Sequence, residues 1–265
     1  MSQVLQQRKD NNGVVTLTLA RPDVHNAVNA ELVAALTSAL LMLQQDSEVR
    51  VVVLTGSGKA FCAGADLNDM RAMITASDED NQQDAMALAV LMRTLNYFPR
   101  PTIAKVNGSA YGGGVGLIAC CDLAVAAENC QFGLSETRLG LVPAVISPYV
   151  VRRIGEPAAR RYFLNGSSFD TAAAKDIGLI HQSCPGTELD QLLTTEINKL
   201  LAAGPVATIF AKQLIFAMAG NDQERQKRLD ENTTAMIAKL RVSPEGQEGM
   251  QAFLEKRHPA WQSKN

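Results

Sequence analysis

The spacing of apolar positions changes about halfway along this chain. In the first half, alternating or short apolar runs predict strands, and apolar residues at three- and four-residue spacing predict helices between them. Strands are expected at residues 14–19, within 50–58 and 101–108, and at 123–127 and 130–134; helices are expected at 29–46, 83–98 and 115–122. The residue before the first helix, Asn29, is a suitable N-cap. This alternation predicts an α/β core.

After about residue 145 the helical period dominates. Candidate helices cover residues 157–166, 170–178, 189–204, 205–220, 223–240 and 245–257. We therefore expect a helical C-terminal extension on the α/β core, with a core region over residues 1–200 and a helical region over 201–265. The methionine- and leucine-rich helical stretches, Met73 included, are expected to belong to the hydrophobic core.

Composition narrows the classes of function. Apolar residues make up 46 % of the 265 residues, and the formal net charge of −2 gives no field that favours nucleic acid or an anionic membrane. No apolar run is long enough to span a membrane, and no secretory signal is evident. The five cysteines form no CxxC pair, and the three histidines are widely separated. We expect reduced thiols, a cytoplasmic location and no metal.

Four glycines lie within residues 112–116, between a predicted strand and a predicted helix. The dinucleotide-binding spacing fails because Leu117 stands where a third glycine is needed, and the phosphate-loop pattern fails around Gly58 because its first glycine is missing. The N–H groups of a first helical turn carry partial positive charge, and glycine lets a ligand oxygen approach them. Oxyanion binding and tight helix–strand packing both remain open interpretations of this run.

A second small, turn-rich loop repeats this arrangement. The stretch "GKAFCAGADLNDM", residues 58–70, follows a predicted strand and precedes a possible helix. The backbone N–H of Ala65 is a candidate donor, so two loops together would supply a two-donor oxyanion hole.

Glu136 is the candidate acid. It lies in "FGLSETRLGLVP", residues 132–143, among large apolar residues. Poor solvation raises the pKa of a carboxyl group and suits it to proton transfer near neutral pH. The alternative is a helix-capping or surface glutamate.

These stretches together resemble the enoyl-CoA hydratase/isomerase (crotonase) superfamily along nearly the whole chain. The matching segments are "LARPDVHNAVN", "VVVLTGSGKAFCAGADL", residues 101–143, "AKDIGLI" and "FLEKR". The resemblance implies a crotonase-like spiral of ββα units with a helical C-terminal trimerisation region, and a homotrimer or dimer of trimers. It also implies an acyl-CoA substrate and no cofactor beyond the coenzyme A that the substrate carries.

The resemblance assigns individual positions. It implies that Ala65 and Gly113 donate backbone N–H groups to the thioester carbonyl, and that Glu136 is catalytic. The residues implied at the coenzyme A site are Val24, Ala63, Asp66 and Leu67, with Phe253 and Lys256 reaching the coenzyme A of a neighbouring subunit.

Two positions depart from the family pattern. Typical hydratases carry two glutamates, and the first of them falls at Gly116 here. The segment "PAVISPYV", from Pro143, replaces a glycine-rich stretch and is expected to border the acyl end of the pocket. Both departures resemble bacterial hydratases of methylglutaconyl-CoA or carboxygeranoyl-CoA, which act on branched, carboxylated chains in leucine or isoprenoid breakdown.

Three hypotheses follow. The first is hydration of a 2-enoyl-CoA by Glu136 alone, with a water held by one of the candidates Asp69, Tyr111, Ser135, Ser147 and Tyr149. The second is double-bond isomerisation, which needs one carboxylate and no water. The third is an acyl-CoA- or RNA-binding protein with little activity, and the charge balance argues against RNA.

Overall fold

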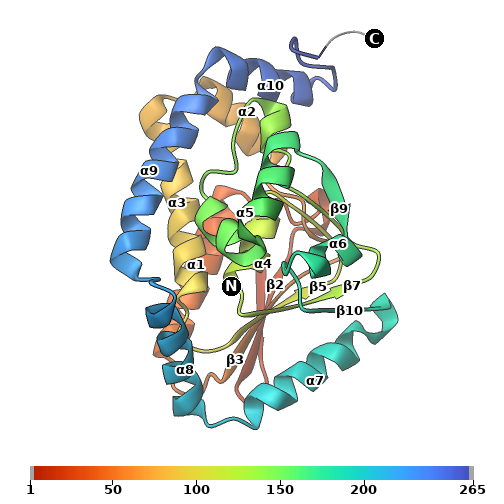
Figure 1. Ribbon diagram of the computed structural model, residues 1–265, viewed down its shortest axis with the longest axis vertical. Coiled ribbons are helices and arrows are strands. Elements are labelled where there is room, and N and C mark those ends of the chain that lie inside the picture. The colour runs from red at the N-terminus through yellow and green to blue at the C-terminus, as the bar shows by residue number, and fades with distance from the viewer. Residues whose placement is uncertain (1–2, 263–265) are drawn as a thin grey trace.

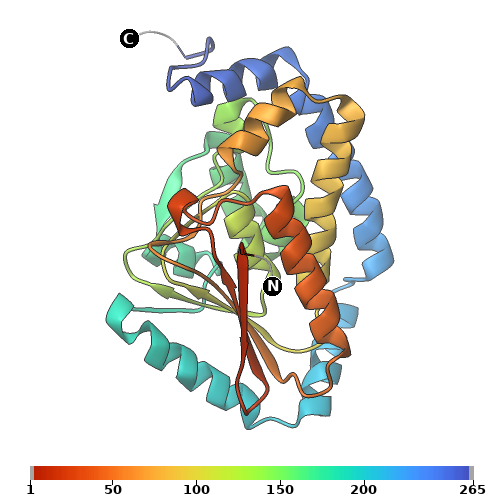
Figure 2. The ribbon, with the colours of Figure 1, turned by 180° about the vertical axis from the view of Figure 1, so that it is seen from behind.

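The computed structural model describes residues 3–262 and contains two β-sheets with helices packed around them (Figures 1 and 2). The strands are β1 (Leu5–Lys9), β2 (Val14–Leu19), β3 (Val51–Gly56), β4 (Ala60–Cys62), β5 (Thr102–Val106), β6 (Ser109–Tyr111), β7 (Leu123–Ala127), β8 (Gln131–Gly133), β9 (Ser168–Asp170) and β10 (Gln182–Cys184). The helices are α1 (Ala30–Gln45), α2 (Leu67–Thr75), α3 (Asp78–Asn96), α4 (Gly113–Cys120), α5 (Ser147–Asn165), α6 (Thr171–Asp176), α7 (Leu189–Leu201), α8 (Pro205–Met218), α9 (Gln223–Arg241) and α10 (Pro244–Leu254). Three short 3₁₀ turns are η1 (Pro22–Val24), η2 (Glu136–Leu139) and η3 (Gly186–Glu188).

The two sheets are built by a repeated unit. The large sheet has the order β1-β2-β3-β5-β7-β10 and the small one the order β4-β6-β8-β9. Consecutive strands β3 and β4, β5 and β6, and β7 and β8 each contribute one strand to each sheet, and a helical segment follows each pair. This is the expected spiral of ββα units.

The small sheet determines where the loops meet. Strands β4 and β6 are parallel, and so are β6 and β8. Carboxyl ends of parallel strands lie at the same edge of a sheet, so the segments that follow Cys62, Tyr111 and Gly133 begin side by side. These segments contain the two glycine loops and Glu136.

Apolar burial explains the strongest elements. Every residue of β3 is buried, as expected for a parallel strand covered on both faces. The predicted N-cap of α1 is confirmed, because the side chain of Asn29 accepts a hydrogen bond from the N–H of Leu32 at 2.9 Å. Helix α4 is buried along most of its length, as its apolar sequence indicates.

The C-terminal helices take different positions (Figure 1). Helix α9 packs along α3, where Arg93 forms an ion pair with buried Asp230. Helix α10 crosses over η2 and α2. Within residues 3–262 no helix taken singly has the length and apolarity to cross a membrane, although Gly186–Leu201 and Pro205–Met218, bent by 97°, meet that criterion as a pair. The proposed division at residue 200 stays a prediction.

Candidate active site

Two glycine loops and one glutamate surround a single cavity. Gly64 follows β4 with a φ of +89°, and Gly112 follows β6 with a φ of +47°. Both angles lie in the left-handed region that glycine adopts without strain. The loops touch: a Cβ on Gly112 would lie 3.9 Å from the Cα of Gly64. The backbone conformation therefore brings Ala65 and Gly113 to neighbouring places on the cavity wall.

The N–H groups of Ala65 and Gly113 are candidate donors. Flanking amides are already used, because Asp66 donates to the carbonyl of Val28 at 2.9 Å and Gly112 donates to the carbonyl of Gly133 at 2.9 Å. Among the residues that the structure describes, no acceptor is recorded for the N–H of Ala65 or Gly113. Gly113 is the first residue of α4, so its N–H also lies at the positive end of the helix dipole. Both residues line the cavity.

Glu136 opens the 3₁₀ turn η2 and lines the same cavity. Its Oε2 atom is shielded from solvent and has no hydrogen-bond partner among the described residues. Burial raises the pKa of its carboxyl group from 4.5 to about 7, although a backbone hydrogen bond acts in the opposite direction. The predicted poorly solvated acid is therefore present, and it can hold or release a proton near neutral pH.

Two glycines of residues 112–116 make room for different groups of the protein. A Cβ on Gly112 would lie 3.0 Å from Oε1 of Glu136, so the missing side chain makes space for the carboxyl group over the start of α4. A Cβ on Gly114 would lie 2.6 Å from the carbonyl oxygen of Cys62 on β4. The packing interpretation of the run is therefore confirmed at Gly114, and oxyanion binding stays a prediction.

Gly116 faces Ile146 rather than a polar group. A Cβ at position 116 would lie 2.3 Å from Cγ2 of Ile146 and 3.1 Å from Cε of Met92. The space beside Gly116 is therefore filled by apolar side chains. Ile146 belongs to the segment that follows Pro143, and residues 143–146 line the cavity as expected.

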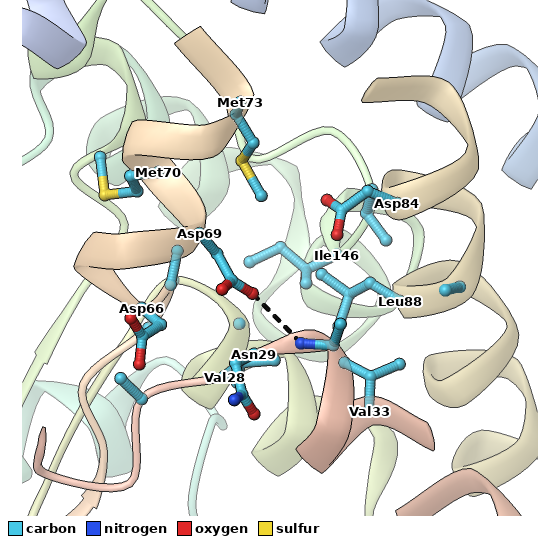
Figure 3. A pocket seen from close by; sticks show the side chains of 18 of the residues that line it. Val28, Asn29, Val33, Asp66, Asp69, Met70, Met73, Asp84, Leu88 and Ile146 are labelled. Atoms are coloured by element: carbon cyan, nitrogen blue, oxygen red, sulfur yellow. Dashed lines mark hydrogen bonds between the residues drawn. The ribbon is translucent and has the colours of Figure 1, made fainter. Parts of the chain in front are cut away.

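The cavity has a volume of about 1430 Å³ and lies between α1, α2, α3 and the loops of the small sheet (Figure 3). Its lining includes five of the residues expected at the coenzyme A site: Val24, Ala63, Asp66, Leu67 and Phe253. A volume of this size accommodates a large ligand.

Asp66 has a structural function in addition to its place on the wall. It caps α2 by accepting from the N–H of Asn68 at 2.8 Å, and it forms an ion pair with Arg21 at 2.7 Å. Burial acts to raise the pKa of this carboxyl group, but the two hydrogen bonds outweigh it and the pKa is lowered. Asp66 therefore stays ionised and charge-paired.

The two C-terminal residues of the expected site differ. Phe253 on α10 lines the cavity of its own chain, whereas the resemblance implies contact with the coenzyme A of a neighbouring subunit. Lys256 is exposed, lies beyond the end of α10 with a φ of 55°, and does not line this cavity. The structure therefore brings Phe253, but not Lys256, to the site within one chain.

The five candidate water anchors separate into two groups. Asp69, Tyr111 and Ser135 line the cavity. Ser147 donates its hydroxyl to the carbonyl of Ala144 at 2.7 Å, and Tyr149 is buried with its hydroxyl unpaired. Neither of these two lines the cavity.

Three residues that line the cavity were not predicted from the sequence. Asp84 on α3 and Arg241 on α9 line the cavity and form an ion pair at 3.0 Å. Met73 was expected in the core but is only partly buried and faces the cavity (Figure 3). The one available signal was the four-residue spacing that places Asp84 on the same face of α3 as Leu88.

Within residues 3–262 no group of three or more metal-ligating side chains is found. Cys62 lies at the base of the loops, but burial raises the pKa of its thiol to about 11, so it is a poor nucleophile at neutral pH. What remains is a pair of backbone donors beside one carboxyl group with a pKa near neutrality. Such donors stabilise negative charge developing on a carbonyl oxygen.

Comparison with known proteins agrees with this geometry. Residues 9–264 match the family described as enoyl-CoA hydratase/isomerase. The chain is 33% identical to the 2,3-dehydroadipyl-CoA hydratase of Escherichia coli, over 98% of both chains. It also resembles a solved enoyl-CoA hydratase from Mycobacterium avium, with 35% identity, a TM-score of 0.87, and coverage of 99% of this chain and 100% of the other.

A solved enoyl-CoA hydratase from Shewanella pealeana is 40% identical, with a TM-score of 0.79 and coverage of 97% of this chain and 96% of the other. These matches extend over almost the entire sequence, and the range of the family match, residues 9–264, spans both glycine loops and Glu136. The chain belongs to the enoyl-CoA hydratase/isomerase family and is an enzyme of the crotonase superfamily.

Proposed function

We propose that this enzyme adds water to the double bond of a 2-enoyl-CoA thioester, with Glu136 as its single catalytic carboxylate. The observation that carries the proposal is the buried, unpaired Oε2 of Glu136 beside two free backbone donors in one cavity. The reaction uses no cofactor other than the coenzyme A carried by the substrate.

The chemistry follows from the positions of these groups. The N–H groups of Ala65 and Gly113 donate to the thioester oxygen, where negative charge develops as the nucleophile adds. The Glu136 carboxylate takes a proton from water, and the hydroxide adds at Cβ. The enolate then takes that proton from Glu136 at Cα, which restores the carboxylate. Each backbone donor contributes about 3 kcal/mol to lowering such a barrier.

The test is turnover of crotonyl-CoA by the wild type and by Glu136→Gln. The wild type is expected to form 3-hydroxybutyryl-CoA. Glu136→Gln is expected to lower kcat by at least a thousandfold while the dissociation constant for butyryl-CoA changes less than threefold. Retained turnover in the variant would remove Glu136 from the mechanism.

Isomerisation is a second candidate, favoured by the surroundings of Gly116. Ile146 and Met92 fill the space beside Gly116, so this part of the wall offers apolar side chains rather than a second carboxylate. A single carboxylate can move a proton between Cα and Cγ without water. Separate incubations with a 3-enoyl-CoA and a 2-enoyl-CoA distinguish the two reactions. An isomerase converts the 3-enoyl-CoA to the 2-enoyl-CoA, whereas a hydratase converts the 2-enoyl-CoA to the hydroxyacyl product.

The branching of the acyl chain and any carboxylate on it stay predictions. The resemblance to methylglutaconyl-CoA hydratases suggests a branched or carboxylated acyl chain and a place in leucine breakdown. The apolar walls formed by Met70, Met73 and Ile146 are compatible with branching. A cytoplasmic location also stays a prediction, and no observation favours RNA as a ligand.

We further propose a homotrimer or a dimer of trimers. Support comes from α8, in which no residue is buried although its sequence is mostly apolar. An exposed apolar face of this kind is typical of a subunit interface.

A further inference from the structure

The backbone that carries the Ala65 donor is paired with the segment that precedes α1. Val28 and Ala65 form an isolated parallel bridge, in which Val28 donates its N–H to the carbonyl of Gly64 at 2.7 Å. The carbonyl of Val28 accepts from the N–H of Asp66 at 2.9 Å. In a parallel bridge the residue between these two bonds directs its own N–H to the opposite side. The N–H of Ala65 therefore points away from Val28, and the bridge sets its direction.

A bridge of two hydrogen bonds is short, and side chains tie the two segments together at both of its ends. At one end Arg21 forms an ion pair with Asp66 at 2.7 Å and donates to the carbonyl of Ala27. At the other end Oδ2 of Asp69 accepts a hydrogen bond from the N–H of Ala30 at 3.1 Å, drawn as the dashed line in Figure 3. Asp69 thus links the first turn of α2 to the first residue of α1.

The favourable contact of the partly buried Asp69 side chain is this hydrogen bond. Burial is the largest effect on its carboxyl group and raises the pKa, while the hydrogen bond from Ala30 is the next largest and lowers it. Among the nearby charges, Asp66 and Asp84 raise the pKa and Arg21 lowers it, and the pKa stays raised as a whole. The side chain is therefore held by a hydrogen bond that an uncharged oxygen can also accept.

We infer that Asp69 is a positioning residue: by holding α2 against the start of α1, it fixes the direction in which Ala65 presents its backbone N–H to the thioester oxygen. This inference rests on the proposed acyl-CoA function and deepens it at the same site. It differs from the expectation that Asp69 anchors the water. Positioning needs an oxygen directed at Ala30, whereas a water anchor needs one directed at the substrate.

Infrared spectroscopy of a bound thioester tests the direction of the donor without turnover. Crotonyl-CoA with ¹³C at the thioester carbonyl is bound to Glu136→Gln, alone and combined with Asp69→Ala or Asp69→Asn. Asp69→Ala removes the acceptor of the Ala30 N–H, so the carbonyl stretching frequency should rise toward that of the ester in water. Asp69→Asn keeps an oxygen for this N–H, and the frequency should stay at the value found with Glu136→Gln alone.

Turnover of crotonyl-CoA by the single variants gives a second measurement. Asp69→Ala should lower kcat by about tenfold to a hundredfold, because a misdirected donor stabilises the transition state less. KM should change by less than about threefold, since the contacts to the coenzyme A part are kept. Asp69→Asn should keep about half of the wild-type kcat or more, because the tie to α1 is preserved.

Asp222→Ala is the matched control. Asp222 caps α9 by accepting from the N–H of Arg225 at 2.7 Å, is exposed, and does not line the cavity. The variant loses a side-chain hydrogen bond of the same kind at a helix N-terminus, so its Tm should fall. Its kcat should equal that of the wild type, and in the Glu136→Gln background it should leave the carbonyl frequency unchanged. A general loss of stability is thereby distinguished from a misdirected donor.

Two results would overturn the inference. One is equal losses of kcat in Asp69→Ala and Asp69→Asn. The other is a carbonyl frequency that Asp69→Ala leaves unchanged, and a lowered kcat together with an unchanged frequency is what a water anchor would give. Failure of the proposed reaction is recognised separately. A wild type that turns over no enoyl-CoA would contradict the proposed function, while a raised frequency in Asp69→Ala would still support the positioning of Ala65.

Discussion

At the scale of single residues, the site depends on a carboxyl group that the fold keeps poorly solvated. The unfolded chain releases the proton of Glu136 near pH 4.5, while the folded protein holds it until about pH 7. The stability that this carboxyl group contributes is therefore complete below pH 4.5 and is lost as pH rises through 7. Above pH 7 the buried carboxylate therefore lowers the stability of the folded protein, and the same burial gives an acid suited to proton transfer.

Glu136→Gln is accordingly expected to be more stable than the wild type at pH 8. At pH 5 the difference in stability between the two proteins is expected to be smaller. At pH 8 the expected gain in the free energy of unfolding is up to about 3 kcal/mol, because the amide is neutral and the destabilising burial of a carboxylate is removed. Urea unfolding of both proteins at pH 5 and pH 8 measures it. An equal difference at the two pH values would contradict the burial of this carboxyl group.

The contact between Gly116 and Ile146 gives a second prediction. Gly116→Ala places a Cβ 2.3 Å from Cγ2 of Ile146, so we expect a loss of about 1–3 kcal/mol in the free energy of unfolding. In the Ile146→Ala background that loss should shrink to under half, since the colliding methyl group is gone. Additive effects in this double-mutant cycle would show that the two residues do not contact each other.

Residue types and local spacing predicted that Glu136 is poorly solvated and that the loop of Ala65 belongs to the same site, and both residues line the cavity. The Gly116–Ile146 contact and the Asp84–Arg241 ion pair were not predictable in the same way. Each joins residues far apart in the chain, and only the packing of α4 against α5 and of α3 against α9 brings them together. The sequence therefore indicated which residue types form the site, but not the ion pair or the apolar contact in the cavity wall.

At the scale of elements, long periodic segments were predicted well, and several short ones were missed. The expected helices α1 and α4 and strands β2 and β3 are present. Strand β1 was missed because four of its five residues are exposed and polar, so it shows no alternation. Strands β4 and β6 have three residues each, and only their partners in the small sheet identify them as strands.

Helix α10 packs directly on the turn that carries Glu136. A Cβ on Gly249 would lie 2.2 Å from the carbonyl oxygen of Leu139, and a Cβ on Gly140 would lie 2.6 Å from that of Glu245. The other side of the turn is held by Thr137, whose hydroxyl donates to the carbonyl of Phe163 at 2.8 Å. The glycines of α10 and η2 thus set the position of the turn.

Gly249→Ala should therefore displace η2 and move Glu136. We expect kcat to fall at least tenfold, with a smaller change in KM, because the thioester still binds to the backbone donors. Gly204→Ala is the control, since its Cβ would meet only Ala207 at 3.7 Å, and it should keep wild-type kinetics. Unchanged kcat in Gly249→Ala would mean that α10 does not position the turn.

At the scale of the whole molecule, the apolar surface of α8 has no partner within the described residues of the chain. Five of its large apolar side chains are between 59% and 77% exposed: Val206, Phe210, Leu214, Ile215 and Met218. The helix lies toward the opposite end of the molecule from α10 (Figure 1). Its sequence predicted a helix, but the apolar face identifies a surface rather than a core element.

Changing Phe210 and Leu214 together to glutamate is expected to break the proposed oligomer. Light scattering after size-exclusion chromatography should give three or six times 28.5 kDa for the wild type and a smaller mass for the double variant. The reason is that charges on the central turns of α8 oppose burial of this face. A wild type that elutes as a monomer, or a double variant of unchanged mass, would contradict a trimer built on α8.

The central claim is that Ala65 and Gly113 polarise a thioester carbonyl next to Glu136. Difference infrared spectroscopy of crotonyl-CoA labelled with ¹³C at the thioester carbonyl, bound to Glu136→Gln, measures this polarisation directly. The account predicts a carbonyl stretching frequency below that of the same ester in water, because two fixed N–H donors withdraw electron density. A bound carbonyl at or above the frequency in water would contradict it.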